Sequence, residues 1–354
     1  MYSVRMVLCF VAVGLMPFVT RAQGPLARAS KSIPQPFETI KNTKQFNAAR
    51  FGPGNSISFV QIPPDFQLDA FAMSPSGRLL AMGWASGRIE LWDLQTKERV
   101  SEFKSGIGAP GVLQFNATED QLIIAAHGGK VAFLGVPSGK KLRGWTIPLG
   151  KYKYDIQELV LDQQGRWIAY ADEETGKVLD IVAESPRQIG DLRDAYSVAL
   201  SLDGRDLWTV NRSELTRYST SNWQETGRYP LQAPPVETSP ALVRTGATQD
   251  GNRSVAVPSS RGLVIYREPD MQGKFVTDEP TSAVAFSRSG GTYINLAGIV
   301  SLVDAAGKVL CSMSYKGRSD YAVSGDGQWL ALSQSDGVDV WRIDDLLHGC
   351  AVQP

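Results

Sequence analysis

The 354-residue sequence is poor in the side chains that most often carry out chemistry at neutral pH. It has two histidines, His127 and His348, and three cysteines, Cys9, Cys311 and Cys350. Neither an HExxH motif nor paired CxxC motifs occur, which excludes the common zinc sites. GxSxG and GxxxxGK[ST] are absent too, which excludes a nucleophile elbow and a P-loop. We therefore expect no metal, no cofactor and no catalytic residues.

The sequence also lacks an excess of charge of either sign, with 36 basic and 36 acidic residues. Proteins that bind nucleic acid or an anionic membrane surface usually carry a basic excess, so we expect neither partner. Gly and Pro are frequent, at 34 and 20 residues, and 43% of the chain is hydrophobic. This composition is typical of a folded protein with many turns.

The sequence has one long apolar run near its start, Met6 to Val19, and this run is too short for a typical membrane span. It follows a basic residue and precedes Thr20-Arg21-Ala22, so it predicts a signal peptide over residues 1–22, cleaved after Ala22. An uncleaved anchor is the alternative. Residues 23–56 are then a polar linker, and the protein is extracytoplasmic, either periplasmic or secreted, with no membrane span after cleavage.

Cleavage there removes Cys9 and leaves two cysteines, Cys311 and Cys350. In an oxidising compartment they can form one disulfide that ties the C-terminal tail, residues 345–354, to the domain. Two separate thiols are the alternative.

The rest of the chain repeats the pattern of one stretch, Leu68 to Phe103. Four short runs of strand-forming residues are separated there by turn residues such as Ser74-Pro75-Ser76-Gly77. This pattern predicts strands joined by hairpins. Similar turns end at positions 77, 120, 165, 204, 251, 290 and 327, with spacings of 43, 45, 39, 47, 39 and 37 residues. Such spacings fall near the period of four-stranded propeller blades, about 40–45 residues.

The repeats predict an all-β fold, a seven-bladed β-propeller of four-stranded antiparallel blades over residues 57–344. The last copy supplies only three good strands, and the run Ile57 to Ile62 has no hairpin partner beside it. We therefore expect this N-terminal strand to complete the last blade, which closes the ring and protects the sheet edges. Large apolar residues two positions after the turn glycine, Leu79, Trp167 and Trp329, are expected to pack between neighbouring blades.

Two copies resemble the WD-repeat family, MSPSGRLLAMGWASGRIELWDL at 73–94 and SGDGQWLALSQSDGVDVWRI at 324–343. The first ends in Trp92-Asp93, and Trp341 holds the matching place in the second. The repeats are degenerate, because the Gly-His dipeptide that usually precedes each one is absent. The resemblance implies a propeller that acts as a platform for protein interactions.

In a propeller, the turns between second and third strands emerge on the same face as the connections from each fourth strand to the next blade. We call this the loop face. Aromatic and arginine side chains, which are frequent at binding hot spots, are expected there. The candidate partner-binding residues are Trp84, His127, Tyr152, Tyr154, Arg212, Arg261, Lys316 and Arg318.

These patterns favour an exported, non-enzymatic and monomeric propeller that binds a protein or peptide through its loop face. The alternative is a small-molecule binder or a lactonase-like hydrolase that uses the central channel.

Overall fold

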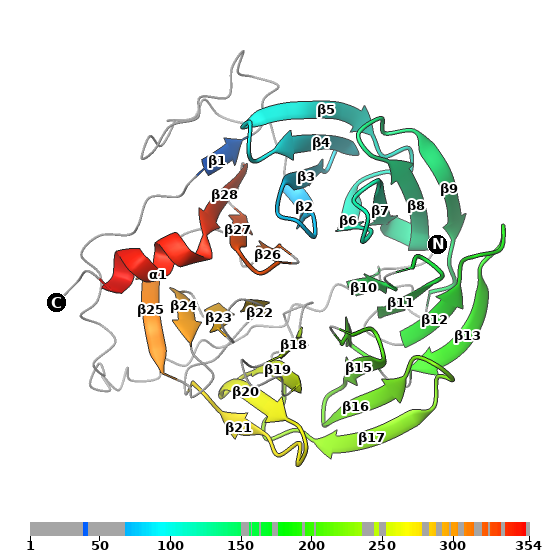
Figure 1. The fold of residues 1–354 in the computed structure, drawn as a ribbon. Helices are drawn as coiled ribbons and strands as arrows, with labels where there is room; N and C mark the ends of the chain where they lie inside the picture. The colour runs from blue at the N-terminus through cyan, green and yellow to red at the C-terminus, as the bar shows by residue number, and fades with distance from the viewer. Residues whose placement is uncertain are drawn as a thin grey trace, which may run out of the picture.

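The computed structural model describes residues 38–41 and most of residues 68–351. The gaps within the second range are 150–155, 157, 163, 172–175, 193–194, 202, 236–243, 248–252, 278–282, 288–291, 297–298, 304–307, 315–320, 325 and 334–336. The described strands form seven four-stranded antiparallel sheets arranged as blades around a central axis (Figure 1). This confirms the prediction of an all-β propeller with four-stranded blades.

The blades follow the order of the chain. Blade 1 consists of β2 (Leu68–Met73), β3 (Leu79–Trp84), β4 (Arg88–Asp93) and β5 (Glu98–Lys104). Blade 2 consists of β6 (Pro110–Phe115), β7 (Gln121–Ala126), β8 (Lys130–Gly135) and β9 (Lys141–Thr146). Blade 3 consists of β10 (Glu158–Leu161), β11 (Trp167–Ala171), β12 (Gly176–Asp180) and β13 (Arg187–Leu192). Blade 4 consists of β14 (Ser197–Leu200), β15 (Asp206–Val210), β16 (Glu214–Ser219) and β17 (Glu225–Pro230).

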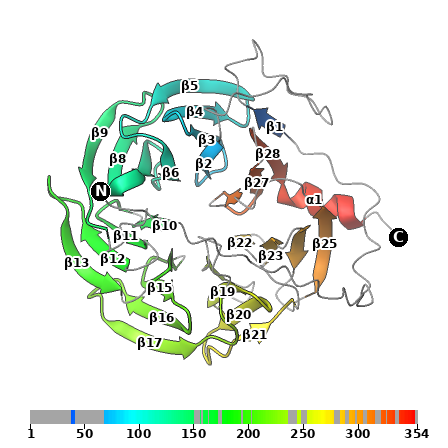
Figure 2. The same ribbon diagram turned by 180° about the vertical axis from the view of Figure 1, so that it is seen from behind.

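The remaining blades repeat this arrangement. Blade 5 consists of β18 (Arg244–Ala247), β19 (Arg253–Ser259), β20 (Gly262–Arg267) and β21 (Lys274–Phe275). Blade 6 consists of β22 (Ala283–Ser287), β23 (Thr292–Leu296), β24 (Ile299–Val303) and β25 (Val309–Ser314). Blade 7 combines β26 (Tyr321–Val323), β27 (Trp329–Ser333) and β28 (Gly337–Arg342) with β1 (Glu38–Lys41). The innermost strands contact one another in chain order, and β26 contacts β2, so the ring is closed (Figure 2).

The strand that closes the ring differs from the one expected from the sequence. Glu38–Lys41 pairs with β28 in antiparallel register, from Glu38 opposite Val340 to Lys41 opposite Gly337. The run Ile57 to Ile62 lies outside the described residues. Propeller closure by an N-terminal strand is thus confirmed. The choice of Ile57 to Ile62 as that strand was wrong, because the closing strand lies within residues 23–56, which were expected to be a linker. A backbone ladder accepts any extended segment that can reach the edge, so residue type alone did not identify it.

The core lies between blades, because each sheet presents apolar side chains on both of its faces. In blade 1, Leu80 and Met82 pack towards blade 7, in a buried cluster with Val338 and Val340. Side chains on the other face of the same sheet, such as Leu91, pack with the apolar side chains of blade 2. No blade can bury both faces alone, so the stability of each blade depends on its two neighbours.

The tight turns hold neighbouring blades close together. Gly77 has φ +72°, and a Cβ atom there would lie 2.4 Å from Cδ1 of Trp329 in blade 7. The glycine is therefore required both for the backbone conformation and for space. Trp167 of blade 3 packs edge-on against Trp223 of blade 4, with ring centroids 4.8 Å apart. These contacts, and the packing of Leu79 against the blade 1–2 cluster, confirm the expected role of large apolar residues after the turn glycine.

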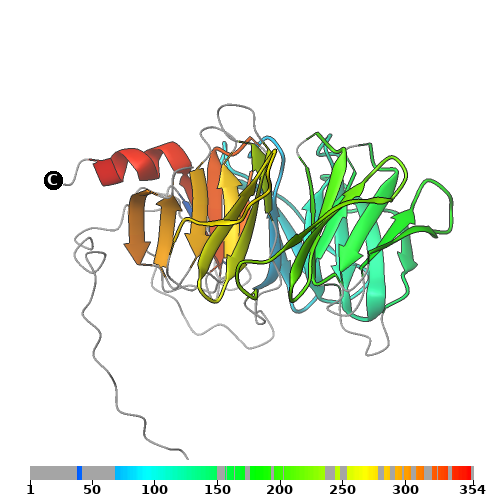
Figure 3. The same ribbon diagram turned by 90° about the horizontal axis from the view of Figure 1, so that it is seen from below.

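The C-terminal segment is not a loose tail. Residues Ile343–Ala351 form helix α1, which begins directly after β28 and contacts β25 of the neighbouring blade (Figure 3). Ile343 and Leu346 are buried beside Cys311 of β25, and the Cys311 Sγ lies 3.8 Å from the Leu346 carbonyl oxygen. Cys311 is disulfide-bonded. Cys350 lies four residues after Leu346 in the same helix. The pairing of Cys311 with Cys350 stays our prediction.

Replacing Cys350 with Ser tests this pairing. We expect the free energy of unfolding of the oxidised protein to fall by about 2–4 kcal/mol, because the disulfide restricts the unfolded chain. Urea unfolding measures the change, and the reduced wild type serves as the control because it should match the variant. A free thiol at Cys350 in peptides from the unreduced protein would contradict the pairing.

Candidate functional site

The predicted partner-binding residues divide into three groups in the structure. His127, Arg212 and Arg261 are exposed on second-to-third strand turns of blades 2, 4 and 5, and therefore lie on the loop face. Trp84 is buried. The remaining four lie outside the described residues: Tyr152, Tyr154, Lys316 and Arg318.

The placement of Trp84 at the surface was wrong, because its side chain is 0% exposed. Trp84 is the last residue of β3, opposite Leu68 in the ladder, and is not part of the turn that follows. It continues the alternation of Leu80 and Met82, whose side chains all join the cluster between blades 1 and 7. Strand periodicity therefore directs the ring inwards.

A buried charged network lies beside Trp84 on β4. The Arg88 guanidinium stacks on the Trp84 ring, with its Cζ 4.7 Å from the ring centroid, and forms an ion pair with Glu90. Trp92 Nε1 donates a hydrogen bond of 3.2 Å to Glu90 Oε2. Burial lowers the pKa of Arg88 to about 10, so the guanidinium stays charged at neutral pH. Because Arg88, Glu90 and Trp84 are all buried, this network stabilises blade 1 and is not a binding site.

His127 begins the short helical turn η4 (His127–Gly129), directly after β7. Gly129 in this turn has φ +72°, and a Cβ atom there would lie 2.5 Å from the Ile147 carbonyl oxygen. The amide of Ile147 donates to the Gly129 carbonyl over 2.8 Å, which ties the turn to the connection towards blade 3. The turn is therefore held by its backbone, and the imidazole extends from it at the exposed surface.

Arg212 and Arg261 are each stacked on an aromatic ring. Arg212 Cζ lies 5.9 Å from the ring centroid of Tyr196, and Arg261 Cζ lies 5.2 Å from that of Phe275. Among the described residues neither arginine forms an ion pair with an acid. Stacking restricts a guanidinium while leaving its N–H groups available in the ring plane, which is a suitable arrangement for an anionic ligand.

The two stacked arginines lie on one structural unit. Their aromatic partners, Tyr196 and Phe275, both pack against the same buried cluster between blades 4 and 5. The connection between these blades also links the two turns. Leu231 N donates to the Ser213 carbonyl over 2.8 Å, and Ser260 N donates to the Pro234 carbonyl over 3.3 Å.

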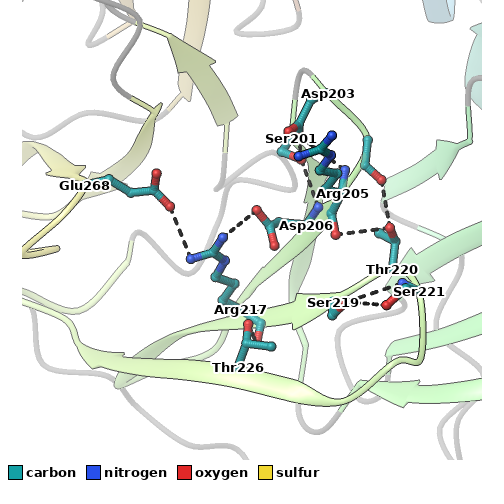
Figure 4. Close-up of polar contacts among 11 residues, drawn as sticks. Ser201, Asp203, Arg205, Asp206, Arg217, Ser219, Thr220, Ser221, Thr226 and Glu268 are labelled. Atoms are coloured by element: carbon teal, nitrogen blue, oxygen red, sulfur yellow. Dashed lines mark hydrogen bonds and ion pairs between the residues drawn. The ribbon is translucent and has the colours of Figure 1, made fainter.

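A second charged arrangement joins blades 4 and 5 towards the opposite face (Figure 4). Arg217 of β16 donates to Asp206 of β15 over 2.7 Å and pairs with Glu268, which follows β20 in blade 5, over 3.1 Å. The hydrogen bond with Asp206 raises the pKa of Arg217, and the Arg217 Cζ lies 5.6 Å from the Trp208 ring centroid. Since both acids engage its guanidinium, Arg217 holds the blades together.

The inner strands use their one described buried acid for structure. Glu158 of β10 accepts hydrogen bonds from the Ser197 hydroxyl and, over 2.9 Å, from the Val198 amide of β14. The carboxylate therefore ties blade 3 to blade 4. No group of three or more His, Cys, Asp or Glu side chains suitable for a metal ion occurs in the described part of the chain. Nor does that part contain a helix long and apolar enough to span a membrane.

Sequence reasoning missed three features of this region. Phe275, the ring under Arg261, lies on the two-residue strand β21, which is too short to recognise from its residues. Arg88 and Glu90 were overlooked, although their spacing in Arg88-Ile89-Glu90-Leu91-Trp92 places both charges on one face of a strand, which signals an ion pair. The link from Arg217 to Glu268 spans two blades and leaves no local pattern.

Comparisons with known proteins support the fold alone. No protein-family model matches the sequence, and no curated protein matches it. Among solved structures, the chain is similar to the β-propeller domain of Cps50 (Swd1) from Myceliophteria thermophila, with a TM-score of 0.64 and 14% sequence identity. The match covers 80% of this chain and 98% of that domain.

The buried pair of Arg88 and Glu90 is expected to contribute to stability as a unit. Arg88→Met should lower the free energy of unfolding by about 3–5 kcal/mol, because it leaves the Glu90 carboxylate without its closest buried partner. Arg88→Met with Glu90→Gln should recover part of this loss, since the neutral amide retains an acceptor for Trp92. Urea unfolding of the double-mutant cycle measures the coupling. The exposed Arg205→Ala in blade 4 is the control, expected to cost less than about 1 kcal/mol, and strictly additive losses would contradict the coupling of Arg88 and Glu90.

Proposed function

We propose that this protein is a non-enzymatic propeller of the WD-repeat type that binds a protein or peptide through its loop face. The observation that supports the proposal is the pair of exposed arginines, Arg212 and Arg261, each stacked on an aromatic ring and without an acidic partner among the described residues. In contrast, buried or half-buried charges such as Glu90, Glu158 and Arg217 bind other parts of the same chain. The charge that remains available is at the surface.

Several residues of the proposed face remain candidates on the basis of sequence. Tyr152, Tyr154, Lys316 and Arg318 fall in connections from a fourth strand to the next blade, between β9 and β10 and between β25 and β26. The fourth strands before them, β9 and β25, end on the same face as the turns of Arg212 and Arg261. We include them, and His127, in the proposed binding surface. Trp84 is not included, because it is buried.

A photo-crosslinking experiment distinguishes the two faces. Ser213 and Ser221 are both exposed and lie in turns at opposite ends of blade 4. A benzophenone amino acid at Ser213 should crosslink a discrete partner in the native compartment, whereas the same group at Ser221 should not. Crosslinks of equal yield from both positions, or from Ser221 alone, would contradict binding through the loop face.

The proposal includes export by the signal peptide over residues 1–22. Expressed in a cell with a secretory pathway, the chain should be recovered outside the cytoplasm with Gln23 at its N-terminus. N-terminal sequencing together with intact mass measures this. Replacing Ala22 with Arg should block cleavage, since the position requires a small residue. A cytoplasmic protein that retains Met1 would contradict export.

A further inference from the structure

Arg212 and Arg261 are attached to a common short bridge, which limits the distance between them. Leu231 is hydrogen-bonded to the turn of Arg212, and Pro234 to the turn of Arg261. A bridge of four residues spans at most about 14 Å even when it is fully extended. Arginine side chains are long, so two guanidinium groups from turns this close can reach oxygen atoms on one ligand.

The underlying packing restricts both side chains before any ligand arrives. Tyr196 and Phe275 are half-buried against one apolar cluster, so the stacked guanidinium groups share a common base. The nearest described acid in sequence, Glu214, lies on the same turn as Arg212 and pairs with Arg228 over 3.7 Å. Neither stacked arginine therefore has to break an ion pair with a described residue before it binds an anion.

Other stacked arginines of the protein provide a comparison. Arg143 stacks on Phe133 but donates to the Ile181 carbonyl over 2.7 Å, so it already serves to join two blades. Arg342 stacks on Trp329 at the end of β28, on the face opposite the loop face. Among the described residues of this region, no second stacked arginine accompanies it. A pair with a common base and with free guanidinium N–H groups occurs, in the described part of the chain, only at blades 4 and 5.

We infer that Arg212 and Arg261 together bind carboxylate side chains of an acidic peptide segment, at the blade 4–5 sector of the loop face. This inference rests on the proposed function and specifies its partner. Guanidinium groups form paired hydrogen bonds with carboxylates, and two of them favour a segment with two or more acids. The protein is electrically balanced, and a nucleic acid would need phosphate contacts along an extended basic surface. A short acidic peptide therefore suits a local pair of arginines better.

Fluorescence anisotropy with two defined decapeptides tests the inference. A labelled (Glu-Gly)5 peptide should bind at least about tenfold more tightly than (Gln-Gly)5 at low salt, and the difference should shrink as added salt screens the charges. Arg212→Ala and Arg261→Ala should each weaken binding of the glutamate peptide severalfold. The double variant should bind both peptides equally weakly.

Three further variants separate the charge, the stacking and the position of the arginines. Arg212→Lys and Arg261→Lys keep the charge but lose the planar group, and should bind with intermediate affinity. Arg342→Ala removes an exposed stacked arginine from the opposite face and should leave the affinity unchanged within about twofold. Unchanged thermal unfolding of all variants verifies that they are folded.

Three results would overturn the inference: equal affinity for the two peptides, a double variant that binds the glutamate peptide like the wild type, or an equal loss in Arg342→Ala. Tighter binding of an oligodeoxynucleotide of the same charge, with the same dependence on Arg212 and Arg261, would assign the pair to phosphate groups and overturn it as well. If the peptide test fails while Ser213 still crosslinks a partner, the loop face binds a different chemistry. If both fail, the proposed function fails too.

Discussion

The structure depends on ring closure, because each blade has two apolar faces and neither can be left in water. The backbone ladder between β1 and β28 completes the last sheet, and β26 contacts β2 to join the last blade to the first. Every cluster between blades then has a partner on both sides. The turns, the inter-blade ion pairs and the exposed residues all take their positions from this closed arrangement.

Charged residues have two different roles in this framework. Arg88 and Glu90 pair inside blade 1, and Arg217 joins blade 4 to blade 5 through Glu268, so these charges serve the structure. Arg212 and Arg261 lie above such an interface and rest on rings that belong to it. The same apolar cluster that stabilises blades 4 and 5 thus also holds the two exposed guanidinium groups.

The repeat pattern was sufficient to predict the fold, because turn residues and apolar phases are local and recur at a regular spacing. It placed Leu79, Trp167 and Trp329 between blades correctly. The closing strand could not be identified in the same way, since the pairing of Glu38–Lys41 with β28 uses backbone groups at opposite ends of the chain. Trp84 was misplaced because it was assigned to the turn after the strand, although the alternation from Leu80 indicated an inward side chain. The ring beneath Arg261 required the three-dimensional arrangement of β21.

The antiparallel pairing of β1 and β28 also determines how the ring would respond to force. Glu38 lies opposite Val340, near the end of β28, so the N-terminal side of β1 and the C-terminal end of β28 emerge at the same end of the ladder. Tension between these two points would separate the strands one hydrogen bond at a time, from that end, instead of loading all of them together. Each such bond contributes only about 1 kcal/mol net. The seam between β1 and β28 therefore resists such tension less than it would if all of its hydrogen bonds were loaded at once.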